Sequence, residues 1–254
     1  MRELFLKLFE MSHFNTGISV TAFSIPHIVY LFLIAGAIVW AWFSFKNKSD
    51  EKKELLLKIL VYALVISYIS DFFMHDFVYG DGLNMDKLPF HICTVLCPIV
   101  AFTQFNKKFK KFIEPVSLLA IVGPLMYIAY PASIGSGEPW CYQAVQTMFY
   151  HGVLLAWGIL NIALKVYKPN IKNCWKAAIL LVIITLWAKL GNSLYEDYNW
   201  FFLEEDAFYI GLVANGIIPK WVLMIATPSA VFLVVLMIYG IYYGVQKLIS
   251  NKKA

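Results

Sequence analysis

The sequence predicts an all-α membrane protein, a polytopic bundle of seven transmembrane helices that forms one domain over residues 1–254. The first observation is composition, since 60% of the 254 residues are hydrophobic and only 15% are charged. Soluble domains run at about 45–50% apolar and about 25% charged residues, so this chain lacks the polar residues to cover a water-facing surface. The second observation is a set of seven apolar runs, each near the length of about 20 residues that a helix needs to cross a bilayer.

The apolar runs give the expected elements in order. Residues 1–10 precede the first run and predict a short interfacial helix, because Leu4 and Phe5 alternate with charged residues such as Glu3. The third and fourth runs are shorter and partly polar. The seven predicted spans cover residues 23–45, 56–79, 88–105, 112–131, 143–167, 174–196 and 221–246.

Loop charge predicts the direction of each span. Lysines follow the first, third, fifth and seventh spans, whereas carboxylates gather in the other loops. In membrane proteins the excess of basic residues lies in the cytoplasmic loops. The N-terminus is therefore expected outside and the C-terminus in the cytoplasm, in a multi-pass protein of the cell membrane. The lysine loops contain Lys46, Lys48, Lys52, Lys53, Lys107, Lys108, Lys110, Lys111, Lys168, Lys172, Lys247, Lys252 and Lys253.

The net charge of +5 does not indicate nucleic-acid binding. Arg2 is the only arginine among the 21 basic residues, and specific phosphate recognition favours the forked guanidinium of arginine. Membrane topology accounts for the lysines instead. The four cysteines are scattered along the chain, which excludes a disulfide scaffold and a paired-cysteine zinc site.

Ionisable and polar side chains inside the predicted spans are the candidate functional residues, because each costs free energy in lipid unless it is paired or solvated. Counting inward at about 1.5 Å per residue places seven of them in the outer half of the membrane. Their convergence at one depth predicts a polar cavity open to the outside, and interhelical hydrogen bonds that hold the bundle are the alternative. The seven are His27, Asp71, His75, Cys93, His151, Lys189 and Asn192.

Two pairings are expected within this group. Asp71 and His75 are four residues apart and share one helix face, so the carboxylate can orient the imidazole. Lys189 lies at a similar depth and is expected to neutralise Asp71. Both a buried structural ion pair and a catalytic one are compatible with this pattern.

The segment 88–93 reads Leu-Pro-Phe-His-Ile-Cys and predicts a reactive thiol. Proline is favoured at the first position of a helix, so the third span is expected to start at Pro89. Cys93 then lies about one turn in, near the positive end of the helix dipole, where a thiolate is stabilised. His91 points to a different face, so the base for Cys93 must come from another span, and His151 is the best placed candidate. A packing thiol is the alternative.

These residues resemble the YwaF-type bacterial integral membrane proteins, a family related to the eukaryotic transmembrane protein 164. The segment 88–93 is similar to the Leu-Pro-Leu-His-Leu-Cys of the family, and the segment 149–152 (Phe-Tyr-His-Gly) and His27 also match. The segment 198–203 resembles the family's Asn-Tyr-Met-Phe-Leu, with the asparagine and tyrosine shifted in order, which aligns Asn199 with the family's asparagine.

The resemblance implies a chemistry for the site. The eukaryotic relatives are described as phospholipid acyltransferases that use the cysteine of this segment and a histidine of a later span. Carried over, this implies Cys93 as the nucleophile, His151 as the base and His91 as a supporting group. The remaining polar residues are then supporting or substrate-binding candidates: Asp71, His75, His27, Lys189, Asn192 and Asn199.

Two functions are compatible with the sequence. The first is a membrane-embedded lipid acyltransferase or lipid hydrolase that uses a Cys/His pair in an outer-leaflet cavity. The second is a small-molecule transporter or a substrate-binding membrane component, although an inverted repeat, which many transporters show, is missing from the sequence. A purely structural or partner-binding membrane protein is a third alternative.

The expected partners follow from the membrane environment. Membrane lipids are the expected partners, with a phospholipid or another acyl ester as the substrate. The spacing of the histidines does not resemble a metal site, so neither a metal nor another cofactor is expected. The sequence leaves the oligomeric state open.

Overall fold

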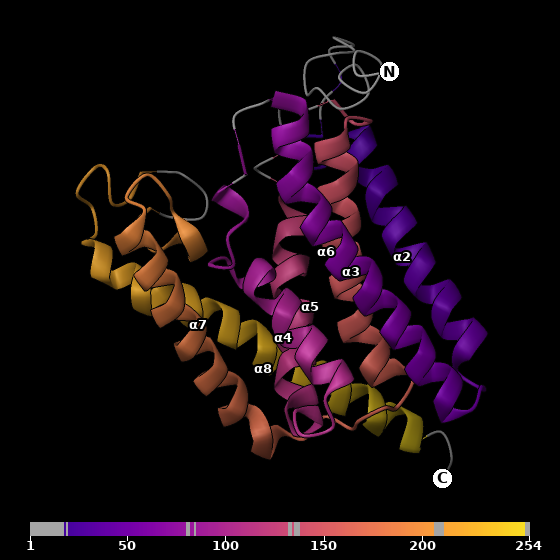
Figure 1. Cartoon of the computed structure of the whole chain (residues 1–254). Helices are drawn as coiled ribbons and strands as arrows, with labels where there is room; N and C mark the ends of the chain where they lie inside the picture. Colours follow the sequence, from indigo (N-terminus) through magenta and orange to yellow (C-terminus); the bar gives the residue numbers. More distant parts are fainter. Residues whose placement is uncertain are drawn as a thin grey trace.

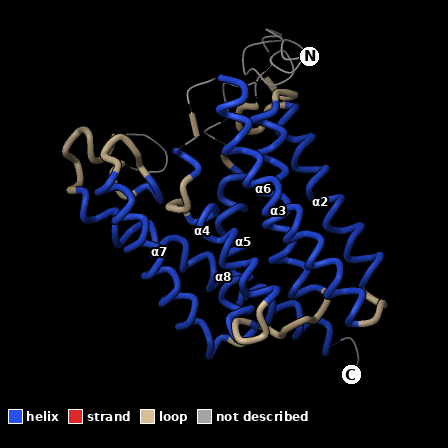
Figure 2. Tube along the Cα trace, viewed as in Figure 1, coloured by secondary structure: helices blue, strands red, loops and turns tan. Residues whose placement is uncertain are grey.

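A computed structural model of the chain describes residues 18, 20–79, 82–83, 85–131, 134, 138–205 and 211–251. Within these residues the chain forms α-helices and short 3-10 turns joined by loops, with no β-strand (Figures 1 and 2). The predicted interfacial helix at residues 1–10 lies outside the described residues. The seven described α-helices are α2 (Ile25–Phe45), α3 (Asp50–Tyr79), α4 (Ile92–Phe105), α5 (Ile113–Ala129), α6 (Tyr142–Ala163), α7 (Cys174–Leu194) and α8 (Leu223–Asn251).

The start of α2 shows how the sequence sets a helix boundary. The Ser24 side chain accepts a hydrogen bond from the backbone N–H of His27, which satisfies one of the free amides of the first turn. Pro26 stands in that same first turn, where its missing N–H costs nothing. The predicted start at residue 23 is therefore close to the observed start at Ile25.

The predicted spans agree with the helices in number and approximate position. Five of the described segments are long and apolar enough to cross a membrane. They contain α2, α3, α5, α7 and α8, whereas α4 has only 14 residues and α6 is more polar. The described part of the chain is thus all-helical with several apolar helices suited to a membrane, and the number of seven crossings stays a prediction.

The helices alternate in direction, so α2, α4, α6 and α8 all end at the lower end of the bundle in Figure 1. The lysine-rich loops follow these helix ends, which brings the lysines of these loops to one end of the molecule. This arrangement is what the positive-inside pattern requires. The side of the membrane that this end faces stays a prediction.

Helices α5 and α6 form the core of the bundle. In the apolar stretch of α5, 67% of the residues are buried, compared with 11% in α2 and 17% in α8. The outer helices turn apolar side chains outward, which lipid can cover. Because α6 is surrounded by other helices, its polar residues face protein partners, and this is the helix that carries His151.

A buried carboxylate ties the core to the loop that precedes α7. Glu114, at the start of α5, accepts hydrogen bonds from the backbone N–H of Asn170 (2.6 Å), the side-chain amide of Asn173 (2.7 Å) and the hydroxyl of Tyr239 (2.9 Å). Glu114 is 8% exposed and serves as an anchor between α5, the α6–α7 connection and α8.

Candidate functional site

The site begins at Cys93, in the first turn of α4. The helix starts at Ile92 with His91 as its N-cap, so the prediction of a start at Pro89 was wrong. The Pro89 carbonyl accepts a 2.7 Å hydrogen bond from the indole N–H of Trp187, and the first helical bond runs from the Val95 N–H to the His91 carbonyl. Cys93 consequently lies closer to the helix N-terminus than expected, among the amides that have no helical acceptor.

Close packing surrounds the thiol. Cys93 is 8% exposed, and a Cβ built on Gly123 of α5 would lie 3.3 Å from its sulfur. The missing side chain at Gly123 therefore lets α5 approach the start of α4. The thiol is held in place by this contact and is buried.

Tyr150 connects the cysteine helix to α6. Its hydroxyl donates a 2.8 Å hydrogen bond to the carbonyl of Cys93, and Cys97 lies one turn deeper in the same helix. A phenol that is buried in this way needs such an acceptor. The sequence alone assigned Tyr150 no role. Its position next to His151 in the segment 149–152 was the one feature that could have indicated it.

His151 is buried beside Tyr150 and held by two contacts. Its Nδ1 lies 2.8 Å from the Thr147 carbonyl, and its ring stacks on Tyr127 with centroids 4.0 Å apart. A carbonyl oxygen can only accept, so Nδ1 carries the proton and Nε2 has a free lone pair. Within the described part of the chain, no hydrogen bond joins His151 directly to Cys93, and Tyr150 is the residue that contacts both.

His91 has the opposite arrangement. Its Nδ1 accepts a 3.2 Å hydrogen bond from the backbone N–H of Phe201, so in the neutral ring Nε2 carries the proton and can donate. His91 and His151 are close enough to interact electrostatically, and Lys87 lies near both rings. Lys87 was missed by sequence reasoning, although it is a basic residue in a loop otherwise marked by carboxylates.

The loop after α7 positions the partner of His91. Phe201 and Phe202 have φ angles of 59° and 55°, in the left-handed region that side chains other than glycine rarely adopt. Asn192 holds this turn by pairing with both the N–H (2.8 Å) and the carbonyl (3.1 Å) of Trp200. Asn199 accepts from the backbone N–H of Glu204 at 3.0 Å. Both asparagines thus organise the loop that contacts His91.

The expected pairing of Asp71 with Lys189 was wrong. Asp71 pairs with Lys87 (3.4 Å), in the 3-10 turn Met85–Lys87, and Lys189 pairs with Glu204 (2.7 Å). The short connection after α3 returns Lys87 to Asp71, whereas Lys189 reaches its partner in the loop that follows its own helix. Lys189 therefore belongs to a separate charge cluster.

Two further histidines complete the predicted set. The Nδ1 of His27 accepts from the backbone N–H of Phe23 (2.8 Å), and its Nε2 donates to the Ile128 carbonyl (2.7 Å). Both nitrogens are therefore engaged, and the ring links α2 to α5. The His75 side chain lies outside the described residues. Among the residues that are described, no three of the histidine, cysteine and carboxylate side chains are grouped so that they could hold a metal ion.

The fold and the site define a class of protein. The chain is a helical membrane protein with several apolar helices, and a buried group of cysteine, histidine and tyrosine side chains lies where α4, α5 and α6 meet. It belongs to the TMEM164 family, whose family model matches residues 22–242. This match confirms the resemblance to transmembrane protein 164 and covers every residue of the site. A search of curated proteins found no match, and a search of solved structures found none either.

Proposed function

We propose that the protein is a membrane-embedded lipid acyltransferase or lipid hydrolase with Cys93 as the nucleophile and His151 as the general base. The observation that carries the proposal is the pair of opposite histidine tautomers. His151 presents a lone pair at Nε2, and His91 presents a proton at Nε2. Acyl transfer needs one group that removes a proton and another that stabilises negative charge.

His151 supplies the base in this mechanism. Its Nε2 accepts the proton of the Cys93 thiol, and the thiolate attacks the carbonyl carbon of an acyl ester. The proton on Nδ1 stays there and donates to the Thr147 carbonyl, while the Tyr127 ring fixes the plane of the imidazole. The hydrogen bond from Tyr150 to the Cys93 carbonyl keeps the two helices in register for this transfer.

The N-terminus of α4 supplies the groups for the developing oxyanion. The amides of the first helical turn have no acceptor one turn earlier, and they surround Cys93 itself. His91 can add its Nε2–H as a further donor from the N-cap position. The thiolate forms a C–S bond to the acyl carbon, and the C–O bond of the ester then breaks. The leaving oxygen takes the proton from His151 and departs as an alcohol. The acyl group then passes from sulfur to the hydroxyl of a lysolipid or to water.

An acyl ester of a membrane lipid is the substrate class that this location favours. Helix α4 begins below the upper ends of α3 and α6, so the site lies inside the bundle rather than at its tip (Figure 1). The ester group of a membrane lipid lies between the head groups and the hydrocarbon core, and we propose that it reaches the site from that side.

The test compares cysteine variants of the purified protein in phospholipid vesicles that carry a radiolabelled acyl chain. We expect Cys93→Ala and His151→Gln to lower acyl turnover at least about a hundredfold, the usual contribution of acid–base catalysis. The matched control is Cys174→Ala, which also removes a thiol from the first turn of a helix, at the start of α7. Wild-type turnover in Cys93→Ala would refute the mechanism. A hydroxylamine-sensitive acyl group on wild-type Cys93, detected by mass spectrometry, would support it.

A further inference from the structure

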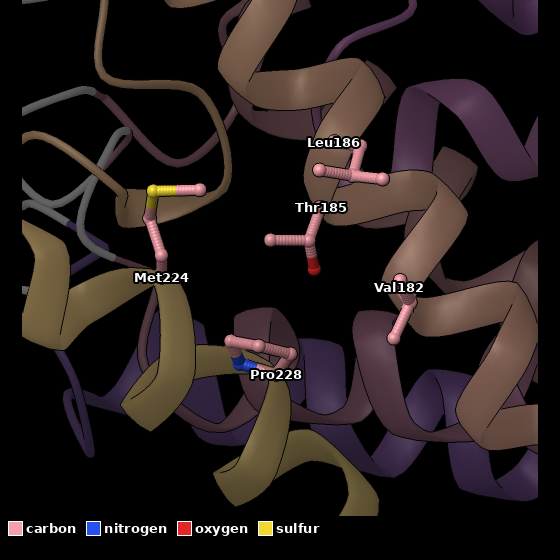
Figure 3. A pocket seen from close by; sticks show the side chains of 5 residues that line it. All are labelled: Val182, Thr185, Leu186, Met224 and Pro228. Atoms are coloured by element: carbon pink, nitrogen blue, oxygen red, sulfur yellow. The ribbon is translucent and has the colours of Figure 1, made fainter.

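An apolar groove separates α7 from α8 at some distance along the chain from Cys93. Figure 3 shows its lining, which consists of Val182, Thr185 and Leu186 from α7 and of Met224 and Pro228 from α8. Thr185 is 5% exposed, whereas Val182 and Leu186 are more than half exposed, at 56% and 59%. The groove is therefore open on its outer side, with Thr185 among its more buried walls.

The sequence of α8 explains why a groove exists here. Pro228 has no backbone N–H, so the carbonyl of Met224, four residues earlier, loses its helical donor. The two residues that border this interruption are the two that line the groove from α8. The volume is about 130 Å³. An engineered cavity of about 150 Å³ accommodates a benzene ring, so the groove has room for a short stretch of hydrocarbon chain.

Two lysines lie close to the groove residues in the sequence. Lys189 follows Thr185 by four residues, about one turn further along α7, and Lys220 lies in the 3-10 turn Lys220–Val222, four residues before Met224. Both ammonium groups bind Glu204, at 2.7 Å and 2.9 Å. An ammonium group has three N–H donors, so each lysine keeps donors for another acceptor.

We propose that this groove binds a membrane phospholipid, with the phosphate on Lys189 and Lys220 and part of one acyl chain between α7 and α8. The two halves of the site match the two halves of such a molecule. The lysine side chains are 39% and 63% exposed, so a head group can reach them, and the groove residues follow about four positions away along two membrane-suited segments. Phosphate oxygens then share the lysine donors with the Glu204 carboxylate.

The test measures lipid retention and thermal stability of the full-length protein in detergent. Phosphatidylglycerol and diacylglycerol with the same acyl chains are titrated separately, and native mass spectrometry counts the bound lipids. We expect phosphatidylglycerol to bind and to raise the Tm, whereas diacylglycerol and inorganic phosphate do neither. Equal effects of diacylglycerol or of inorganic phosphate alone would overturn the proposal.

Three variants separate a lipid site from a structural ion cluster. Lys189→Gln with Lys220→Gln is expected to weaken phosphatidylglycerol binding at least roughly tenfold, since each basic residue at a membrane surface contributes roughly fivefold. Glu204→Gln releases both lysines and is expected to tighten binding, whereas a purely structural cluster would lose stability without any gain in affinity. Leu186→Trp fills the exposed side of the groove and is expected to weaken binding while the head-group lysines remain.

The matched control removes one lysine near the start of α7 and one near the end of α8, Lys176→Gln with Lys247→Gln. It is expected to bind phosphatidylglycerol as the wild type does. Unchanged binding in both the Lys189/Lys220 pair and Leu186→Trp would refute the site. So would a dimer mass without bound lipid, because a second copy of the chain would then cover the groove.

Discussion

The rings of Tyr127 and His151 lie face to face, with centroids 4.0 Å apart and an angle of 10° between their planes. Tyr127 comes from α5 and His151 from α6, so this contact joins the two central helices at the proposed base. Together with the Nδ1 contact to Thr147, it holds the imidazole in one orientation. Tyr127 is thus a positioning residue in the proposed mechanism.

Removal of this stacking is expected to impair turnover more than binding. Tyr127→Leu should lower kcat about tenfold and leave KM close to the wild-type value, because misorientation of a base affects the chemical step. Tyr127→Phe keeps the ring and should restore most of the activity. Steady-state kinetics in lipid vesicles provide the measurement. A loss in Tyr127→Phe as large as that in Tyr127→Leu would mean that the hydroxyl, rather than the stacking, is required.

Gly191 is expected to tolerate no side chain. A Cβ at this position of α7 would lie 2.5 Å from the Phe90 ring, which is packed between Trp187 and Trp200. Such overpacking typically costs about 1–3 kcal/mol, so Gly191→Ala should lower the Tm. Gly240→Ala is the control, because nothing lies within 4 Å of its Cβ and alanine favours the helix. Thermal unfolding of both variants measures the contrast, and equal Tm values would contradict the packing described.

Glu114 should be replaceable by glutamine but not by alanine. Alanine leaves the Asn170 N–H, the Asn173 amide and the Tyr239 hydroxyl without their acceptor, and each buried orphan costs about 1–3 kcal/mol. Glutamine keeps one carbonyl oxygen, which can still accept from Asn170 and Tyr239. If the Asn173 amide flips, its oxygen can accept a hydrogen bond from the new NH₂ group of the glutamine. Chemical denaturation gives the difference in the free energy of unfolding. If Glu114→Gln were as unstable as Glu114→Ala, the charge itself would be essential.

Stability should depend on pH through Glu204. Partial burial raises the pKa of this carboxyl, but hydrogen bonds from Lys189 and Lys220 outweigh the burial and hold it below its usual value of 4.5. A carboxyl whose pKa is lower in the folded state than in the unfolded state stabilises the fold at any pH above its unfolded-state pKa. This stabilisation is lost as the pH falls through its folded-state pKa. The Tm of the wild type should therefore fall below pH 4.5 more steeply than that of Glu204→Gln. Parallel curves would show that the cluster does not contribute.

The sequence was sufficient for the helices but not for several contacts of the site. Apolar runs placed the helices because lipid and core both select for hydrophobic residues along a whole span. The start of α4 was misplaced because the Pro89 carbonyl is taken by Trp187, a partner 98 residues away that no local pattern indicates. Lys189 was predicted as the ion-pair partner of Asp71 because the two residues lie at similar depth. The turn after α3 instead brings Lys87 close to Asp71.

The histidine roles also needed the folded chain. The motif 88–93 identified His91 and Cys93, but the tautomer of His91 depends on the N–H of Phe201, which a left-handed turn presents. That turn is held by Asn192 and Asn199, two residues that the sequence predicted only as supporting or substrate-binding candidates. Tertiary contacts of this kind follow from the fold rather than from residue spacing.

The polarity of α6 has a consequence for how the protein is made. This helix carries Gln146, Thr147, His151 and Asn161 among its buried residues and is not among the segments apolar enough to cross a membrane by themselves. Left alone beside lipid, it would expose those groups to hydrocarbon, where each unsatisfied group costs several kcal/mol. Helix α6 is therefore expected to enter a bilayer together with the helices that shield it, and α5, which precedes it in the chain and packs against it, is the natural companion. The proposed site is then expected to be complete only after the neighbours of the helix that carries His151 are in place.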